Sequence, residues 1–125
     1  MGAYKDALRA SYLAFTAQAR HGQQITETID RASRELSEAT GGLLTLKEDK
    51  DTLFVTHTDG VALRLFSLAR AAGAYPVSIG DVVIGRANDA RDLESMLVSM
   101  LSHQNTYSRI KESWPSIRFS FEADR

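Results

Sequence analysis

Three residues of the sequence have side chains that could meet to do chemistry: His57, Asp59 and Asp81. Histidine exchanges a proton near neutral pH, and neighbouring carboxylates can share that proton or help to bind a metal ion. His57 and Asp59 stand two positions apart at the end of an expected strand, which turns both side chains to one face. Asp81 joins them if the neighbouring strands pair. However, a strand end followed by Asp59-Gly60 is typical of any hairpin, and no second histidine lies nearby. We therefore favour a structural role for these residues.

Local signatures of catalysis do not strengthen the case for an enzyme. The sequence has no Gly-x-Ser-x-Gly elbow for a nucleophile and no His-Glu-x-x-His pattern for zinc. The stretch from Gly80 to Gly85 lacks the Lys-Ser/Thr ending of a phosphate loop. The chain also has no cysteine, which removes thiol nucleophiles and thiolate metal sites. We therefore expect a protein that is not an enzyme, with no catalytic residue, no cofactor and no metal.

Arginine side chains offer a second kind of site. Arg64 and Arg70 fall on the same side of an expected strand, and Arg86 and Arg91 flank the start of an expected helix, where backbone N–H groups also favour anions. Together they could form a patch for phosphate groups of a nucleic acid. The net charge of −1 and several acidic neighbours argue against it, because nucleic-acid-binding proteins usually show a basic excess. Anion or nucleic-acid binding is therefore the alternative and not the favoured hypothesis.

The N-terminal third of the sequence predicts helices. Residues 3–21 and 24–39 both carry apolar side chains at steps of three and four, the spacing of one helix face. Arg20, His21 and Gly22 between them are typical of a helix C-terminus. We expect a helical hairpin or a kinked helix, although one continuous helix remains an alternative because a single glycine costs only about 1 kcal/mol.

The middle of the chain changes to a period of two, which predicts strands. Apolar and polar residues alternate over 44–47 and 53–56, with an acidic turn between them. Residues 61–70 fit either a strand or a helix, and the turns that flank them favour a strand. Residues 76–86 are rich in β-branched side chains, and Gly80-Asp81 within them suggests a bulge. Alternation over 117–121 predicts a final strand.

A long helix is expected between these strands, over residues 88–114. Asn88 is suited to be its N-cap, and Pro115 closes it. His103 interrupts the apolar stripe, so we expect a kink there, with Asn105 capping a second short helix. The resulting fold class is α+β, with an antiparallel sheet of four to five strands and a long helix before the last one.

Surplus apolar surface is the main functional hint. Ile25, Ile29 and Leu36 form a narrow seam suited to a partner helix, in the same chain or in a second copy. Phe66 and Leu68 lie on a strand that looks apolar on both faces, and such a strand must be covered on both sides. We therefore predict these five residues as the partner-binding set.

The totals place the chain among ordinary folded proteins. Its 125 residues, 43% of them hydrophobic, suit a single domain over 1–125. No apolar run approaches the ~20 residues that span a bilayer, and the N-terminus lacks a signal-peptide block, so we expect a cytoplasmic protein without a membrane partner. In size and layout alone the expected domain is similar to small bacterial secretion chaperones and toxin-neutralising proteins. From the surplus apolar surface we expect a small non-enzymatic module, an adaptor, chaperone-like or neutralising protein, that binds a protein partner through its sheet or N-terminal helices and forms a homodimer.

Overall fold

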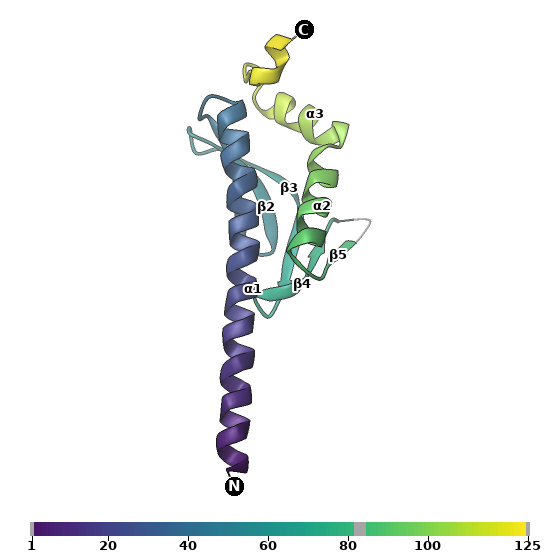
Figure 1. The fold of residues 1–125 in the computed structure, drawn as a ribbon. Helices are drawn as coiled ribbons and strands as arrows, with labels where there is room; N and C mark the ends of the chain where they lie inside the picture. Colours follow the sequence, from purple (N-terminus) through teal and green to yellow (C-terminus); the bar gives the residue numbers. More distant parts are fainter. Residues whose placement is uncertain (1, 82–84, 125) are drawn as a thin grey trace.

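The computed structural model describes residues 2–81 and 85–124 and has the α+β architecture expected from the sequence. Five antiparallel strands follow one another in chain order across one sheet, β1-β2-β3-β4-β5. The helices α1 and α2 lie side by side on one face of this sheet, and α1 projects far beyond it (Figure 1). None of the helices within the described residues combines the length and apolar character that crossing a bilayer requires.

The N-terminal helix α1, Ala3–Ala39, is one continuous helix of 37 residues. The predicted break at Gly22 is therefore wrong, and the continuous alternative is the one observed. Gly22 lies where the turn between β3 and β4 comes closest to the helix: a Cβ atom built there would lie 2.9 Å from the carbonyl oxygen of Gly73. The glycine thus marks a close approach between helix and sheet, and its ~1 kcal/mol cost to the helix is small beside the packing that follows it.

Two hairpins build the first part of the sheet. Strands β1, Leu44–Asp49, and β2, Thr52–His57, pair in regular register through the predicted acidic turn. Strand β3, Ala62–Ala71, pairs with β2 and confirms the strand interpretation of residues 61–70. Its register with β2 shifts at Leu65, which has no partner because Leu53 lies opposite Phe66 and Phe54 lies opposite Arg64. This β-bulge moves all later side chains of β3 to the other face.

The sheet ends in two short strands where one bulged strand was expected. Strand β4, Ala74–Ile79, pairs antiparallel with β3, and β5, Gly85–Ala87, folds back to pair with β4. Gly80, with φ of 103°, leaves β4 in a conformation that favours glycine. Gly80-Asp81 therefore begins a chain reversal and not a bulge; residues 82–84 of the predicted strand lie outside the described residues.

The long C-terminal helix is divided in two at the predicted kink. Helix α2 spans Ala90–Leu101 and α3 spans Gln104–Ser113. Asp89, not Asn88, is the N-cap of α2, because its carboxylate accepts from the N–H of Asp92 at 2.8 Å. His103, not Asn105, caps α3, since its ring nitrogen accepts from the N–H of Asn105 at 3.2 Å.

The predicted final strand is wrong. Ile117 and Phe119 are buried while Arg118 and Ser120 are exposed, so the predicted alternation is real, but these residues pair with no strand. Glu122 accepts from the N–H of Phe119 at 2.5 Å. The chain then ends in a short 3-10 helix, η1, Ser120–Asp124. Hydrogen bonds from local side chains thus take the place of the strand pairing that the alternation predicts.

The core lies between the sheet and the helices that cover it. Fully buried side chains come from α1, from all of the first four strands and from α2, and the largest are Ile25, Leu44, Leu53, Leu68, Ile79 and Leu93. The opposite face of the sheet carries polar residues such as Thr45 and Thr56, whose hydroxyl oxygens lie 2.8 Å apart. The sheet therefore has one apolar and one polar face, as antiparallel sheets commonly do.

Candidate functional site

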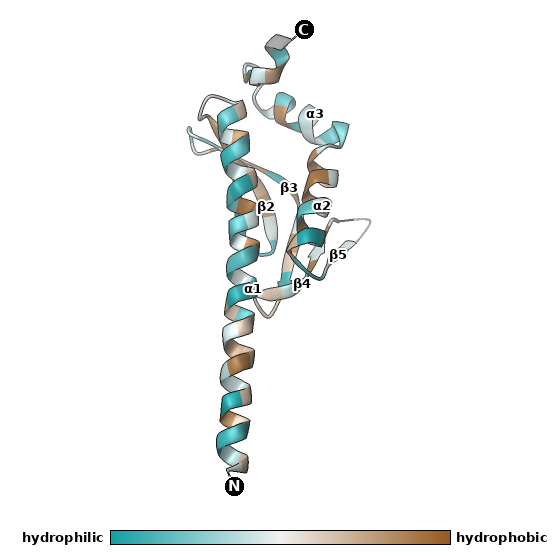
Figure 2. Cartoon of the chain, viewed as in Figure 1, coloured by the Kyte–Doolittle hydropathy of each residue, from teal (hydrophilic) through white to brown (hydrophobic). Residues whose placement is uncertain are grey.

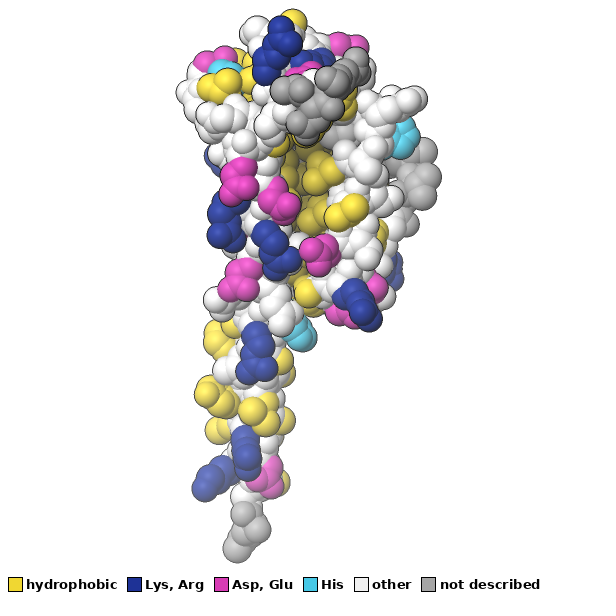
Figure 3. Space-filling view, turned by 45° about the horizontal axis from the view of Figure 1, so that its top comes forward, with side chains coloured by type: hydrophobic (Ala, Val, Ile, Leu, Met, Phe, Trp, Pro, Cys, Tyr) yellow, Lys and Arg dark blue, Asp and Glu magenta, His cyan; other side chains and the backbone are white. Residues whose placement is uncertain are grey.

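An apolar groove opens on the helix-covered side of the molecule, between α1 on one side and α2 with α3 on the other. We call it the helix groove; its volume is about 560 Å³. The space-filling view shows hydrophobic side chains exposed in this hollow (Figure 3). Its apolar lining includes Ala32, Leu36 and Ala39 of α1, Leu97, Val98 and Leu101 of α2, Ile110 of α3, and Phe121 near the C-terminus, above a floor of Leu46 and Val55.

The groove arises because the two covering helices do not fill the sheet face. Near its start α2 packs beside β5 and approaches α1, where the Arg31 guanidinium lies 3.3 Å from the Glu94 carboxylate. Farther along, the helices stand apart, and Val98 of α2 remains 61% exposed within the groove wall. Volumes of about 300–1,000 Å³ with mostly apolar walls are typical of binding pockets.

Charged groups stand at the rim of the groove and not within it. Arg31, Glu35 and Glu94 line its edge. The Arg31–Glu94 pair is more than half exposed on both sides, so it contributes at most about 1 kcal/mol and can open at little cost. An apolar trough with charges at its rim is the arrangement by which grooves take up amphipathic helices.

A polar cluster that includes the groove-lining residue Tyr107 joins α3 to η1. The Tyr107 hydroxyl donates to the Glu122 carboxylate, and the Lys111 ammonium lies 2.9 Å from the same carboxylate. The bond from Tyr107, followed by that from Lys111, holds the pKa of Glu122 at about 2. The bond between Tyr107 and Glu122 also raises the pKa of Tyr107. The cluster ties η1 to α3 and so holds Phe119 and Phe121 at the groove.

Most of the first part of α1, residues 3–21, extends beyond the sheet, and near its end Gln18 and His21 contact the β3–β4 turn and Tyr75 of β4; we call this part the α1 extension. Its five large apolar side chains are between 53% and 89% exposed: Tyr4, Leu8, Tyr12, Leu13 and Phe15. Figure 2 shows hydrophobic positions along this stretch of helix with no other element beside them. A side-chain bond from the Gln18 amide to the carbonyl of Ala72 joins its end to the β3–β4 turn. Such a large apolar patch on a soluble monomer usually marks an interaction site.

Most of the predicted partner-binding residues are used by the protein's own core. Ile25, Ile29, Phe66 and Leu68 are at most 4% exposed, because α1 covers one face of the sheet and the bulge turns Phe66 and Leu68 toward it. They present no surface to a partner in this structure. Leu36 is the exception, since it is partly exposed and lines the helix groove.

The predicted arginine patch is not assembled. The bulge at Leu65 places Arg64 and Arg70 on opposite faces of the sheet, which corrects the expectation that they share a face. Arg70 lies on the side of α1, where it pairs with Glu48 and donates to the carbonyl of Gly22 at 3.0 Å. Arg86 and Arg91 are exposed near the start of α2, as expected. Two of the four guanidinium groups are thus engaged within the chain.

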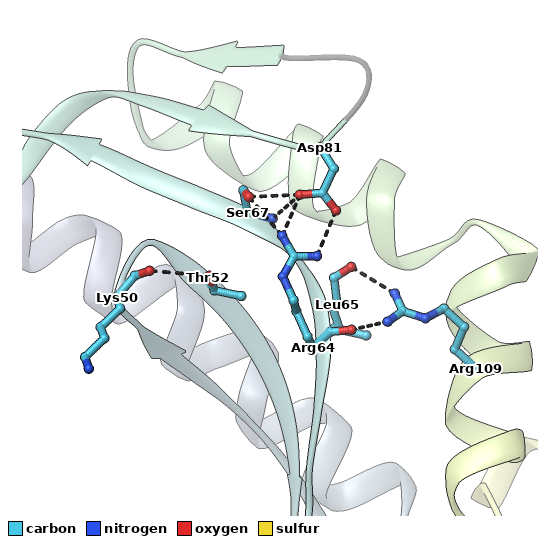
Figure 4. A network of polar contacts seen from close by, with 7 residues as sticks. All are labelled: Lys50, Thr52, Arg64, Leu65, Ser67, Asp81 and Arg109. Atoms are coloured by element: carbon cyan, nitrogen blue, oxygen red, sulfur yellow. Dashed lines mark hydrogen bonds and ion pairs between the residues drawn. The ribbon is translucent and has the colours of Figure 1, made fainter.

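Arg64 belongs to a polar network on the open face of the sheet (Figure 4). Its guanidinium donates two bonds to the Asp81 carboxylate, at 2.7 and 2.9 Å, and the backbone N–H and hydroxyl of Ser67 donate to the same carboxylate. The bond from Arg64, followed by that from Ser67, holds the pKa of Asp81 far below its usual range. On the neighbouring helix, Arg109 donates at 2.9 Å to the carbonyl of the bulged Leu65. The network fixes the bulge and the start of the β4–β5 connection.

The residues His57, Asp59 and Asp81 do not form one site. The ring of His57 lies 3.2 Å from the Asp59 carboxylate and stacks on Trp114 at 5.6 Å. Asp81 instead binds Ser67. Ser67 lies about 20 Å along β3 from the end of the strand beside His57, at ~3.3 Å per residue. Across residues 2–81 and 85–124, no group of three His, Cys, Asp or Glu side chains is placed to hold a metal ion.

Comparisons with family models, with curated proteins and with solved structures found no match to this chain. The helix groove and the α1 extension therefore have to be interpreted from their own geometry. The stripe of Tyr4, Leu8 and Phe15 is visible in the sequence, but only the structure shows that nothing covers it. The groove has no local signal, because its walls come from segments far apart in the chain.

Proposed function

We propose that this protein is a non-enzymatic protein-interaction module whose helix groove takes up an apolar helix of a protein partner. One observation carries the proposal: an open trough of about 560 Å³ with apolar walls and floor lies between two helices of the same sheet face. Peptide helices bind such troughs by inserting side chains at i, i+3, i+4 and i+7. A chaperone-like role in the cytoplasm, shielding an apolar segment of a partner, fits this geometry and the absence of cysteine from the sequence.

Anion binding is the weaker candidate. Arg64 and Arg70, half of the residues expected for it, are engaged with Asp81 and Glu48 on opposite faces of the sheet. A phosphate-binding role would have to break both ion pairs and would still lack a common face. The apolar groove needs no such rearrangement.

A helical probe peptide tests the proposed function. We would titrate the isotope-labelled protein with a 15-residue amphipathic peptide of leucine and lysine, and with a scrambled peptide of the same composition. We expect the amphipathic peptide alone to shift the backbone amide signals around Leu36, Val98 and Leu101. Two valines of similar exposure give a matched pair of variants, because Val98 lines the groove and Val61 lies at the β2–β3 turn.

The substitution Val98→Lys should weaken peptide binding at least tenfold, since it puts a charge into the groove wall. Val61→Lys should leave the affinity unchanged. Equal affinity in both variants, or signal shifts confined to the open face of the sheet, would overturn the proposal.

A further inference from the structure

We propose that the occupant of the helix groove is a second copy of this chain, with the α1 extension as the inserted helix. This inference rests on the proposed function and names the partner for the same groove. Each molecule carries both halves of the contact: an unfilled apolar trough and an uncovered apolar helix. The extension projects away from its own groove on a straight helix, so it can reach only the groove of another molecule (Figure 1).

The distribution of side chains around the extension fits enclosure on several sides. At about 100° per residue, its four charged side chains share about 100° of the circumference: Lys5, Asp6, Arg9 and Arg20. Most of the remaining circumference is apolar or small, including an alanine stripe at Ala3, Ala7, Ala10, Ala14 and Ala17. A seam between two helices needs a much narrower apolar stripe. A helix that lies between two walls and a floor needs a wide one.

The lengths of the two surfaces agree. The large apolar side chains run from Tyr4 to Phe15, about 16 Å along the helix axis at ~1.5 Å per residue. The α1 wall of the groove runs from Thr28 to Ala39, which is also about 16 Å. Small residues on that wall, Ala32 and Ala39, allow another helix to approach closely.

The charges of the two parts are opposite. Residues 3–21 carry three basic and one acidic side chain, a net charge of +2. The whole chain has a net charge of −1, so the rest of it carries −3. Glu35 and Glu94 at the groove rim are placed to meet the basic side of an inserted extension. Two extensions pairing with each other would bring like charges together.

The area is sufficient for a stable dimer only if the exchange is reciprocal. The three exposed aromatic side chains of one extension offer roughly 400 Å² to a partner, on a scale of ~150–250 Å² for each complete ring. Two extensions and the two groove surfaces they cover reach the ~1,200–2,000 Å² of a standard interface. A reciprocal exchange also closes the assembly, whereas a one-way contact leaves a groove and a helix free to add further copies.

Sedimentation equilibrium of the full chain tests the proposal. We expect the wild type to have about twice the monomer mass of 13.8 kDa. Leu8→Lys, in the extension, and Val98→Lys, in the groove, should each raise the dimer dissociation constant at least 100-fold. Val61→Lys is the matched control and should remain dimeric. Circular dichroism should show the same helix content in all four proteins, because these side chains are exposed in the single chain.

Mixing the two monomeric variants gives the sharper test. The Leu8→Lys chain keeps an intact groove and the Val98→Lys chain keeps an intact extension, so their mixture regains one of the two contacts. We expect a heterodimer that is weaker than the wild-type dimer but detectable at high protein concentration. Neither variant alone should self-associate at the same protein concentration. If Val98→Lys alone stays dimeric, the extensions pair with each other and the proposal is overturned.

The failure of this inference can be separated from failure of the proposed function. A peptide of residues 3–21 should bind the open groove of the Leu8→Lys variant more tightly than it binds the wild type, where an extension competes. A monomeric wild type that binds only the leucine-lysine peptide would refute the second-copy partner and leave the groove function standing. A monomeric wild type that sediments with phosphatidylserine vesicles through its extension would refute it in favour of a membrane surface.

Discussion

Replacing Gly22 by alanine sets two effects of known size against each other. In the interior of an ordinary helix the change would stabilise α1 by about 1 kcal/mol, because alanine loses less backbone entropy than glycine. Here the new Cβ atom would lie 2.9 Å from the backbone oxygen of Gly73, which is closer than a carbon and an oxygen can approach without strain. The same turn of helix accepts a bond from Arg70 at 3.0 Å, so the helix cannot simply move away.

Overpacking of this kind destabilises a folded protein by about 1–3 kcal/mol. We therefore expect Gly22→Ala to lower the free energy of unfolding by about 1 kcal/mol after the gain in helix propensity is subtracted. Urea unfolding followed by circular dichroism measures this change. Asp30→Ala is the matched control: it lies in the same helix on an exposed face and should change stability by no more than about 0.5 kcal/mol. A Gly22→Ala protein that is about 1 kcal/mol more stable than the wild type would refute the close contact between α1 and the β3–β4 turn.

Three further predictions concern the stability of the fold. Ile25→Ala should cost about 2–5 kcal/mol of unfolding free energy, because Ile25 is fully buried between α1 and the sheet; a loss below about 1 kcal/mol in urea unfolding would contradict that burial. Arg64 is the main cause of the lowered pKa of Asp81, so the ionised carboxylate stabilises the folded state. This stabilisation is fully present above the ordinary aspartate pKa of 3.8 and is lost as the pH falls below that value. Asp81→Asn should therefore be less stable than the wild type at neutral pH, and its stability should fall less below about pH 4. If the free energy of unfolding in urea depends on pH in the same way for both proteins, the role of the ion pair is refuted. His57→Ala should cost about 0.5–1.5 kcal/mol and alter the fluorescence of Trp114, because the two rings stack; an unchanged stability and spectrum would refute the structural role of the histidine.

The elements that could be predicted from the sequence are those specified by neighbouring residues. The first hairpin follows from the alternation on both sides of an acidic turn, and the structure shows Lys50 and Asp51 of that turn with positive φ. The break at His103 follows from the interruption of an apolar stripe. In these cases the deciding interactions lie within a few positions along the chain.

The predictions that failed depend on contacts between distant segments. Gly22 does not end α1, because its partner is the turn at Gly73, about fifty residues later. The placement of Arg64 and Arg70 depends on a bulge at Leu65, and no local sequence pattern in β3 predicts this bulge. The carbonyl of Leu65 accepts a bond from Arg109, which is distant in the sequence.

The candidate site was predicted only in outline. The sequence predicts surplus apolar surface, but four of the five predicted residues belong to the core, because the sequence does not reveal which apolar stripe packs within the chain. Leu36 alone reaches the groove. The sequence does not show that the stripe from Tyr4 to Phe15 is uncovered, because the spacing of apolar residues is the same whether or not a surface lies opposite them.

A disulfide between two molecules tests the central claim most directly. The chain has no cysteine, so Leu8→Cys and Val98→Cys each introduce a unique thiol. When the two variants are mixed and oxidised, we predict rapid formation of a mixed disulfide that joins the α1 extension of one molecule to the helix groove of the other. Leu8→Cys mixed with Val61→Cys should form it far more slowly. Equal rates for the two mixtures would contradict the placement of a second copy in the groove.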